Sequence, residues 1–223
     1  MFADYHVHTE YSDDSLYPME EVVKDAFRLG LDEICFTDHV DYGIKPDWDG
    51  PEPIVWRRGG SGEPDKIPLA NVDYPRYEAE IRKLQEKYRG QITLRMGLEF
   101  GMQVHTIPLY EKLFARYPFD FILLSVHQVE DKEFWNQDFQ RGRTREEFNR
   151  RYYEELLALV RRYRHYSVLA HPDLITRYDS AGPWPFEKLR PILTEILKTV
   201  IADGKGIEVN TSCHRYGLKD LTP

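Results

Sequence analysis

The sequence predicts an α/β fold in which a mainly parallel sheet is built from repeated strand and helix segments. Two observations lead to this expectation. Short apolar runs alternate with amphipathic segments along the 223 residues, and polar residues recur where the apolar runs end. Because a barrel-like fold gathers its strand ends at one face, these polar residues are expected to meet in one pocket.

The helices and strands are expected in regular alternation. The first helix is expected at residues 18–30, with a proline at its start, two acids in its first turn and a glycine after its end. It separates the strand that carries His6 and His8 from the apolar run 33–37. Later helices are expected at 74–88, 109–116, 144–164 and 186–203, followed by strands at 92–99, 119–127, 167–171 and 206–210.

Residues 42–75 interrupt this alternation. They are rich in Pro, Gly, Asp and Trp, with Gly-Gly-Ser-Gly at positions 59–62. So long a stretch without regular structure is usually a functional loop, and its place after His39 suggests a lid beside the pocket. The alternative is a disordered surface insertion.

Bulk composition narrows the class of protein. With 41% hydrophobic residues, 223 residues supply one sizeable core, so a single domain is expected. The net charge of −8 disfavours a nucleic-acid partner, whereas a small phosphorylated substrate needs only local positive charge. No secretory signal and no run of about 18 apolar residues is visible, so we expect a cytoplasmic protein without membrane association. Cys35 and Cys213 are too few for a disulfide framework.

Histidines at the strand ends, together with one glutamate, form the candidate site. A single histidine, such as His165 in a polar run, is more simply a residue bound to a nearby polar group. Repetition at the end of one apolar run after another favours a metal centre, because an unpartnered imidazole in an apolar place is costly. Imidazole and carboxylate ligands together suit zinc, manganese or iron. The candidates are His6, His8, His39, Glu99, His105, His127 and His171.

Seven short motifs follow one another along nearly the whole sequence. They are His6-Val-His8, Ser12-Asp-Asp-Ser15, Thr37-Asp-His39, Gly97-Leu-Glu-Phe100, Ser125-Val-His-Gln128, Ala170-His-Pro-Asp173 and Glu208-Val-Asn-Thr-Ser212. The ordered set resembles the PHP (polymerase and histidinol phosphatase) superfamily, and within it the histidinol-phosphate phosphatases. The resemblance implies a distorted (β/α)7 barrel with two or three divalent metal ions at its strand ends. It also implies a metal-dependent phosphatase of L-histidinol phosphate in histidine biosynthesis.

The resemblance also implies a role for each site residue. The implied ligands are His6 and His8 for a first metal, Glu99, His127 and His171 for a second that Glu99 bridges to the first, and Asp14 and His39 for a third. Glu99, His127 and His171 are also the implied catalytic residues. Clustered cations lower the pKa of a water between them, so that hydroxide can attack the phosphorus, and they offset charge on the leaving alkoxide. Asp13 competes for the place of Asp14, which fits the family's Ser-x-Asp-Ser register better.

Three further residues are candidates for binding the substrate. The resemblance places phosphate-binding arginines at Arg177 and Arg215. A guanidinium group can donate two parallel hydrogen bonds to two oxygens of one phosphate. The alternative for each is a solvated or ion-paired surface arginine. His105 either contacts the substrate, orients a metal ligand, or caps the turn before Pro108.

One departure from the family concerns the end of the sequence. Family members usually continue through a further helix to a Gly-Ser-Asp-x-His segment that completes two metal sites, and the sequence ends at Pro223 without it. The barrel is therefore expected to lack its last β-α unit, and an exposed sheet edge favours either a homodimer or pairing with another partner. The alternatives are a metal-binding protein with little catalysis and a PHP nuclease or nucleotide phosphoesterase.

Overall fold

The computed structural model describes residues 2–57 and 67–212. The chain forms two compact units. Unit 1 comprises Met1–Glu99 and Arg116–Ile122, and unit 2 comprises Phe100–Ala115 and Leu123–Pro223. Two strands, β6 (Thr93–Gly101) and β7 (Phe121–Ser125), continue from unit 1 into unit 2. The prediction of a single domain stays a prediction.

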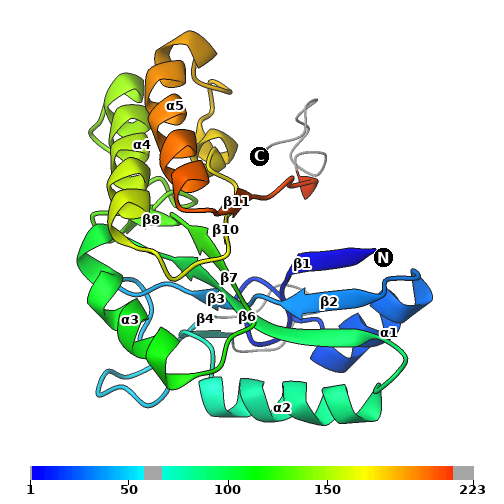
Figure 1. The fold of residues 1–223 in the computed structure, drawn as a ribbon. Helices are drawn as coiled ribbons and strands as arrows, with labels where there is room; N and C mark the ends of the chain where they lie inside the picture. The colour runs from blue at the N-terminus through cyan, green and yellow to red at the C-terminus, as the bar shows by residue number, and fades with distance from the viewer. Residues whose placement is uncertain (1, 58–66, 213–223) are drawn as a thin grey trace. The chain divides into compact units, whose positions relative to one another are not determined.

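Unit 1 is built on parallel strands. β1 (Ala3–Val7) pairs with β2 (Glu33–Phe36), and β2 pairs with β6. A two-residue strand, β3 (His39–Val40), also pairs with β6 (Figure 1). The strand ends that follow Val7, Phe36 and Leu98 therefore lie at the same edge of the sheet, and the histidines and the glutamate follow these positions.

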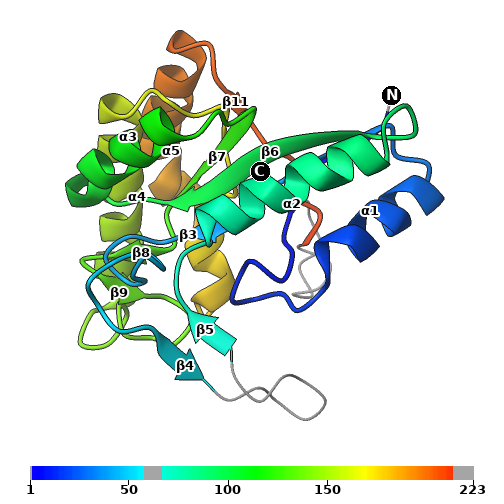
Figure 2. The ribbon, with the colours of Figure 1, turned by 90° about the horizontal axis from the view of Figure 1, so that it is seen from below.

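Two helices cover one face of these strands in Figure 2. α1 (Met19–Arg28) buries Met19 and Val23, and α2 (Tyr74–Lys87) buries Tyr77 and Ile81, so each presents an apolar stripe to the sheet. Asp73 caps α2 by accepting a hydrogen bond from the backbone N–H of Arg76 at 3.3 Å. Both helices were expected from the sequence, and both are confirmed.

The segment between β3 and α2 is more regular than expected. It contains an antiparallel hairpin of β4 (Val55–Arg57) and β5 (Ile67–Leu69), so the expectation of a stretch without regular structure is wrong for these residues. The short apolar pieces were hidden by the surrounding prolines, which are depleted in strands. The residues that connect the two strands, 58–66, lie outside the described part of the chain.

Unit 2 continues the alternation of strands and helices. β10 (Val168–Leu169) lies parallel between β7 and β11 (Gly206–Ile207). α3 (Ile107–Arg116) starts two residues earlier than expected, because Pro108 is tolerated in a first turn. Thr144 and Glu147 form a capping box at the start of α4 (Arg145–Arg162).

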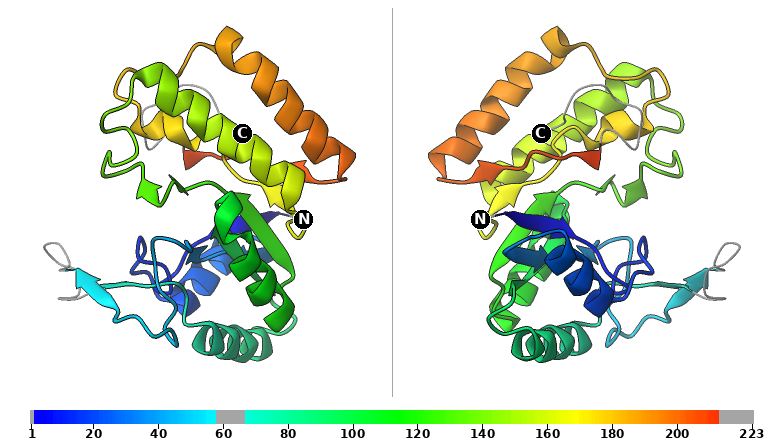
Figure 3. Two further views of the ribbon diagram at one scale, coloured as in Figure 1. Left: turned by 90° about the vertical axis from the view of Figure 1, so that its left-hand side faces the viewer. Right: turned by 90° about the vertical axis from the view of Figure 1, so that its right-hand side faces the viewer.

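The remaining elements of unit 2 are short except for the last helix. α5 (Phe186–Ala202) packs beside α4 in Figure 3. A small antiparallel pair, β8 (Gln128–Val129) and β9 (Lys132–Glu133), follows β7. Two 3-10 turns, η1 (Val104–Thr106) and η2 (Leu174–Tyr178), precede α3 and follow β10. Among the described residues, no helix has the length and apolar character needed to cross a membrane.

Candidate metal centre

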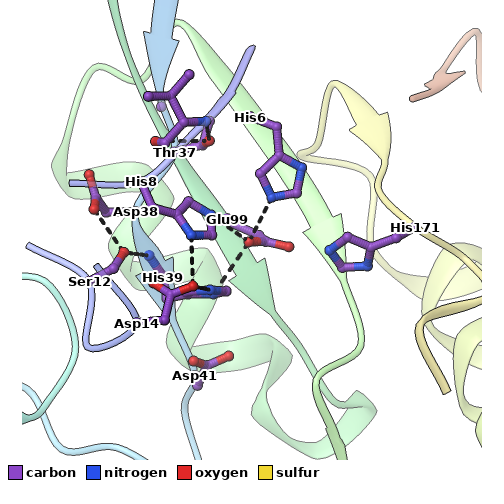
Figure 4. Close-up of polar contacts among 12 residues, drawn as sticks. His6, His8, Ser12, Asp14, Thr37, Asp38, His39, Asp41, Glu99 and His171 are labelled. Carbon is purple, nitrogen blue, oxygen red and sulfur yellow. Dashed lines mark hydrogen bonds and ion pairs between the residues drawn. The ribbon is translucent and has the colours of Figure 1, made fainter. Parts of the chain in front are cut away.

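Three histidines of unit 1 converge on one oxygen of Glu99. The distances to Glu99 Oε2 are 3.1 Å from His6 Nε2, 3.1 Å from His8 Nε2 and 3.3 Å from His39 Nδ1 (Figure 4). Glu99 has no exposed surface. Its place is set by β6, where the Glu99 backbone N–H donates to the carbonyl of Asp38 at 3.0 Å. The sequence predicted that these strand-end residues would meet, and within unit 1 they do.

The loop after β1 contributes one carboxylate to this cluster. Asp14 Oδ2 lies 3.1 Å from His8 Nδ1 and 3.4 Å from His39 Nε2. The neighbouring Asp13 makes a different contact, because its Oδ1 accepts a hydrogen bond from Lys45 Nζ at 2.6 Å. The structure therefore places Asp14, and not Asp13, against the histidines.

Asp38 holds the loop against the strand ends. It is fully buried, and its Oδ1 accepts hydrogen bonds from the Thr9 backbone N–H and the Ser12 hydroxyl, both at 2.7 Å. Ser12 Oγ in turn accepts the His39 backbone N–H at 3.0 Å. Asp38 was not among the predicted site residues, although it stands in the Thr37-Asp-His39 motif at the end of an apolar run.

Burial and charge shift the pKa values of this cluster. Burial alone would lower the pKa of His8, but the carboxylates of Asp14 and Glu99 outweigh it and raise the pKa well above its usual value. Burial would raise the pKa of Asp14, but the imidazoles of His39 and His8 hold it far below its usual range. Burial raises the pKa of Asp38, although its hydrogen bonds oppose the shift. The charges of the cluster are thus strongly coupled, as at many functional sites.

The spacing of the donor atoms fits a divalent cation. His8, His39 and Glu99 each offer a ligand atom, and the three atoms lie within 4.8 Å of one another. Ligand atoms bound to one ion at about 2.1 Å lie roughly 3.0–3.4 Å apart, depending on the coordination geometry. The separations from Glu99 Oε2 to His8 and His39, 3.1 and 3.3 Å, fall in this range. Partly buried imidazole nitrogens around a buried carboxylate oxygen suit zinc, manganese or iron.

Unit 2 holds the other predicted ligands. The rings of His127 and His171 have their centroids 5.6 Å apart. The His171 backbone N–H donates to Glu208 Oε1 at 2.9 Å, and Asn210 Nδ2 donates to the same oxygen at 2.9 Å. His171 has a positive φ of 22°, which non-glycine residues rarely adopt outside special sites. This turn ends β10 earlier than the sequence suggested.

The predicted substrate-binding residues have different positions. Arg177 lies in η2, six residues after His171. His105 lies in η1 with half of its side chain exposed, and its Nε2 is 2.9 Å from Asp131 Oδ1. Arg215 lies outside the described residues. The roles of these residues stay predictions.

Comparison with known proteins identifies the class. The PHP domain family matches residues 4–212. The histidinol-phosphatase of Lactococcus lactis is 30% identical over 214 residues, which are 93% of this chain and 71% of that protein. The histidinol-phosphatase of Bacillus subtilis is 24% identical over 94% of this chain and 80% of its own length.

Solved structures agree with this result. The crystal structure of the Lactococcus lactis histidinol phosphate phosphatase, in complex with zinc, L-histidinol and phosphate, matches with a TM-score of 0.77 at 30% identity. The matched region covers 94% of this chain and 73% of the Lactococcus lactis chain. A structure from Listeria monocytogenes is 17% identical and matches with a TM-score of 0.68. The match covers 97% of this chain and 85% of the Listeria chain, and it supports the fold.

The fold and the cluster define a PHP-type α/β protein with groups able to hold metal ions. The chain belongs to the PHP domain family. The α/β fold class expected from the sequence, with its resemblance to the distorted PHP barrel, is confirmed.

Proposed function

We propose that this protein is a metal-dependent phosphatase that hydrolyses L-histidinol phosphate. The observation that carries the proposal is the convergence of three imidazoles on the buried carboxylate of Glu99 at distances suited to metal ligands. The relatives named histidinol-phosphatase support the choice of substrate, since they match most of this chain. A cytoplasmic location and a homodimer stay predictions.

The proposed ligand set follows the sequence analysis. Bound divalent cations would supply an activated water and offset the negative charge of the phosphate. Zinc is the first candidate metal, because the Lactococcus lactis neighbour was solved with zinc and the donors are imidazoles and carboxylates. Manganese and iron remain candidates with the same donors. The proposed ligands are His6, His8, Asp14, His39, Glu99, His127 and His171.

The residues of the chain have defined tasks in this scheme. Glu99 supplies a fixed negative charge at the centre of the cluster, where no solvent screens it. Asp38 and Ser12 fix the loop after β1 and the backbone of His39, so that ligands from separate segments keep their spacing. Arg177, Arg215 and His105 are proposed to bind the substrate, and a guanidinium suits its phosphate group.

The proposal is tested by phosphate release from L-histidinol phosphate. The protein is reconstituted separately with zinc, manganese and iron(II), and turnover is expected with at least one of them. Glu99→Gln keeps the shape of the side chain and removes its charge, so turnover should fall by about 10²–10³-fold, the loss typical of removing one electrostatic group at a reacting centre. Glu20→Gln, on α1, is the matched control, because Glu20 pairs with Lys87 away from the cluster.

The outcome separates this proposal from the alternatives. Silence with all three metals, in protein that has bound them, would contradict a phosphatase of this substrate. Faster cleavage of single-stranded DNA than of histidinol phosphate would indicate a nuclease. Unchanged turnover in Glu99→Gln would show that the cluster on Glu99 is not the reactive centre.

A further inference from the structure

Lys45 forms a buried ion-pair triad beside the metal cluster of unit 1. Its Nζ lies 2.6 Å from Asp13 Oδ1 and 2.7 Å from Asp41 Oδ2. The exposed fractions of the three side chains are 8% for Lys45, 16% for Asp13 and 6% for Asp41. One ammonium group is thus shared by two carboxylates with little access to water.

The triad connects two of the segments that carry metal-ligand candidates. Asp13 lies next to Asp14 in the loop after β1, and Asp41 lies two residues after His39 at the end of β3. The Lys45 backbone N–H donates to the Asp41 carbonyl at 2.9 Å, which fixes the turn that brings its side chain back.

A second residue holds this turn in place. Asn71 Oδ1 accepts the Asp41 backbone N–H at 2.8 Å, and Asn71 Nδ2 donates to the Lys45 carbonyl at 3.1 Å. Asn71 is fully buried. Lys45 is therefore positioned by the fold, and its contacts with the two acids do not depend on a flexible surface side chain.

We propose that Lys45 keeps Asp13 and Asp41 from binding metal ions, so that Asp14 is the carboxylate which the loop offers to His8 and His39. This inference rests on the proposed metal-dependent function. Asp13 and Asp41 are otherwise suitable ligands, because carboxylates bind divalent cations well and both lie beside metal-ligand candidates in the sequence. The ammonium of Lys45 pairs with one oxygen of each acid, Asp13 Oδ1 and Asp41 Oδ2, and its positive charge disfavours a second cation beside them.

The contacts of Asp13 and Asp14 show how the selection works. Adjacent residues in a loop point in different directions, and here Asp13 turns to Lys45 while Asp14 turns to the two imidazoles. Lys45 is thus a positioning residue, and it sets how many carboxylates the cluster contains. Without it, the loop would carry two competing acids, and Asp41 would be a third.

The first test compares two isosteric variants by the Mn²⁺ bound per chain, measured by equilibrium dialysis at a fixed free concentration. Asp14→Asn is expected to lose about one Mn²⁺ per chain, because a ligand carboxylate is replaced by a weaker amide. Asp13→Asn is expected to keep the metal content of the unchanged protein. Equal losses in the two variants would overturn the inference.

The second test removes the ammonium group. Lys45→Met is expected to bind about one Mn²⁺ more per chain, since two buried carboxylates are left to bind a cation. Lys45→Arg should keep the original metal content, because it keeps a positive side chain between the two acids. The triple variant Asp13→Asn/Asp41→Asn/Lys45→Met should also keep it, because both carboxylates are removed. A metal content in Lys45→Met equal to that of the unchanged protein would contradict the inference.

Both tests stay decisive if parts of the scheme fail. Should Lys45→Met not fold, the Asp13 and Asp14 pair still decides, because each of those variants keeps Lys45. Metal counting does not require turnover, so the absence of phosphatase activity would refute the proposed function and leave the result on Lys45 standing. Normal turnover together with equal metal loss in both aspartate variants would refute the inference alone.

Discussion

Among the glycines of the described residues whose surroundings are known, Gly97 on β6 is the one where an added methyl group meets the closest atoms. A Cβ added there would lie 2.5 Å from the backbone carbonyl oxygen of Phe121, 2.8 Å from Cys35 Sγ and 3.1 Å from the Phe36 carbonyl oxygen. Two of these atoms belong to the backbone of neighbouring strands and cannot rotate away. Overpacking of this kind costs about 1–3 kcal/mol, and the contact with a fixed carbonyl places Gly97→Ala near 3 kcal/mol.

The assay is thermal unfolding of the metal-free protein. A loss of about 3 kcal/mol should lower Tm by roughly 6–12 °C in a chain of this size. Because Glu99 lies two residues further along the same strand, metal affinity should fall as well. Gly90→Ala is the control: its φ is +77° and nothing lies within 4 Å of the added Cβ, so a loss of only about 1–2 kcal/mol is expected. A Tm of Gly97→Ala equal to that of the unchanged protein would refute the steric argument.

Three further predictions concern stability. Burial raises the pKa of Asp173 to about 6, whereas its pKa in the unfolded chain is near 3.8. Because the unfolded chain releases this proton at a lower pH than the folded protein does, the free energy of unfolding should fall by about 2–3 kcal/mol as the pH rises from 4 to 6. In denaturant titrations, Asp173→Asn should lose this part of the pH dependence, and identical profiles would contradict the assignment. Removing metal with a chelator should lower the free energy of unfolding by about 2.7 kcal/mol, for a metal present at a hundred times its Kd, and should therefore lower Tm. An unchanged Tm would argue against metal binding to the folded state. Thr144→Ala should lower the free energy of unfolding, measured by chemical denaturation, by about 1 kcal/mol, since Thr144 and Glu147 form the capping box of α4. An effect below the measurement error would mean that the cap does not stabilise the helix.

Much of the fold could be predicted because its signals are local. Apolar periodicity, capping residues and glycine stops depend on neighbours within a few positions, and they located α1, α2, α4 and α5 to within a few residues. The hairpin of β4 and β5 was missed because each strand has only three residues and both lie in a segment rich in proline and glycine. The short length of β10 was missed because the turn at His171 is set by its surroundings.

The candidate site was predictable in its residue types and less so in its arrangement. The histidines and Glu99 could be found because each ends an apolar run, and parallel strands bring such ends together. Lys45 carries no such signal, and Asp38, although it also ends an apolar run, is an acid and not a histidine. Their importance comes from burial and from partners that lie 26 to 32 positions away in the sequence.

The sequence by itself determined the alternation of the main strands and helices, the family resemblance and the set of possible metal ligands, because these depend on residue type and spacing. The sequence favoured Asp14 over Asp13 by its register, but only the tertiary structure decided which acids are paired with Lys45 and why position 97 is a glycine. These choices depend on distances of a few ångströms between segments far apart in the chain. Such distances are fixed by strand register and side-chain packing, which no local pattern records.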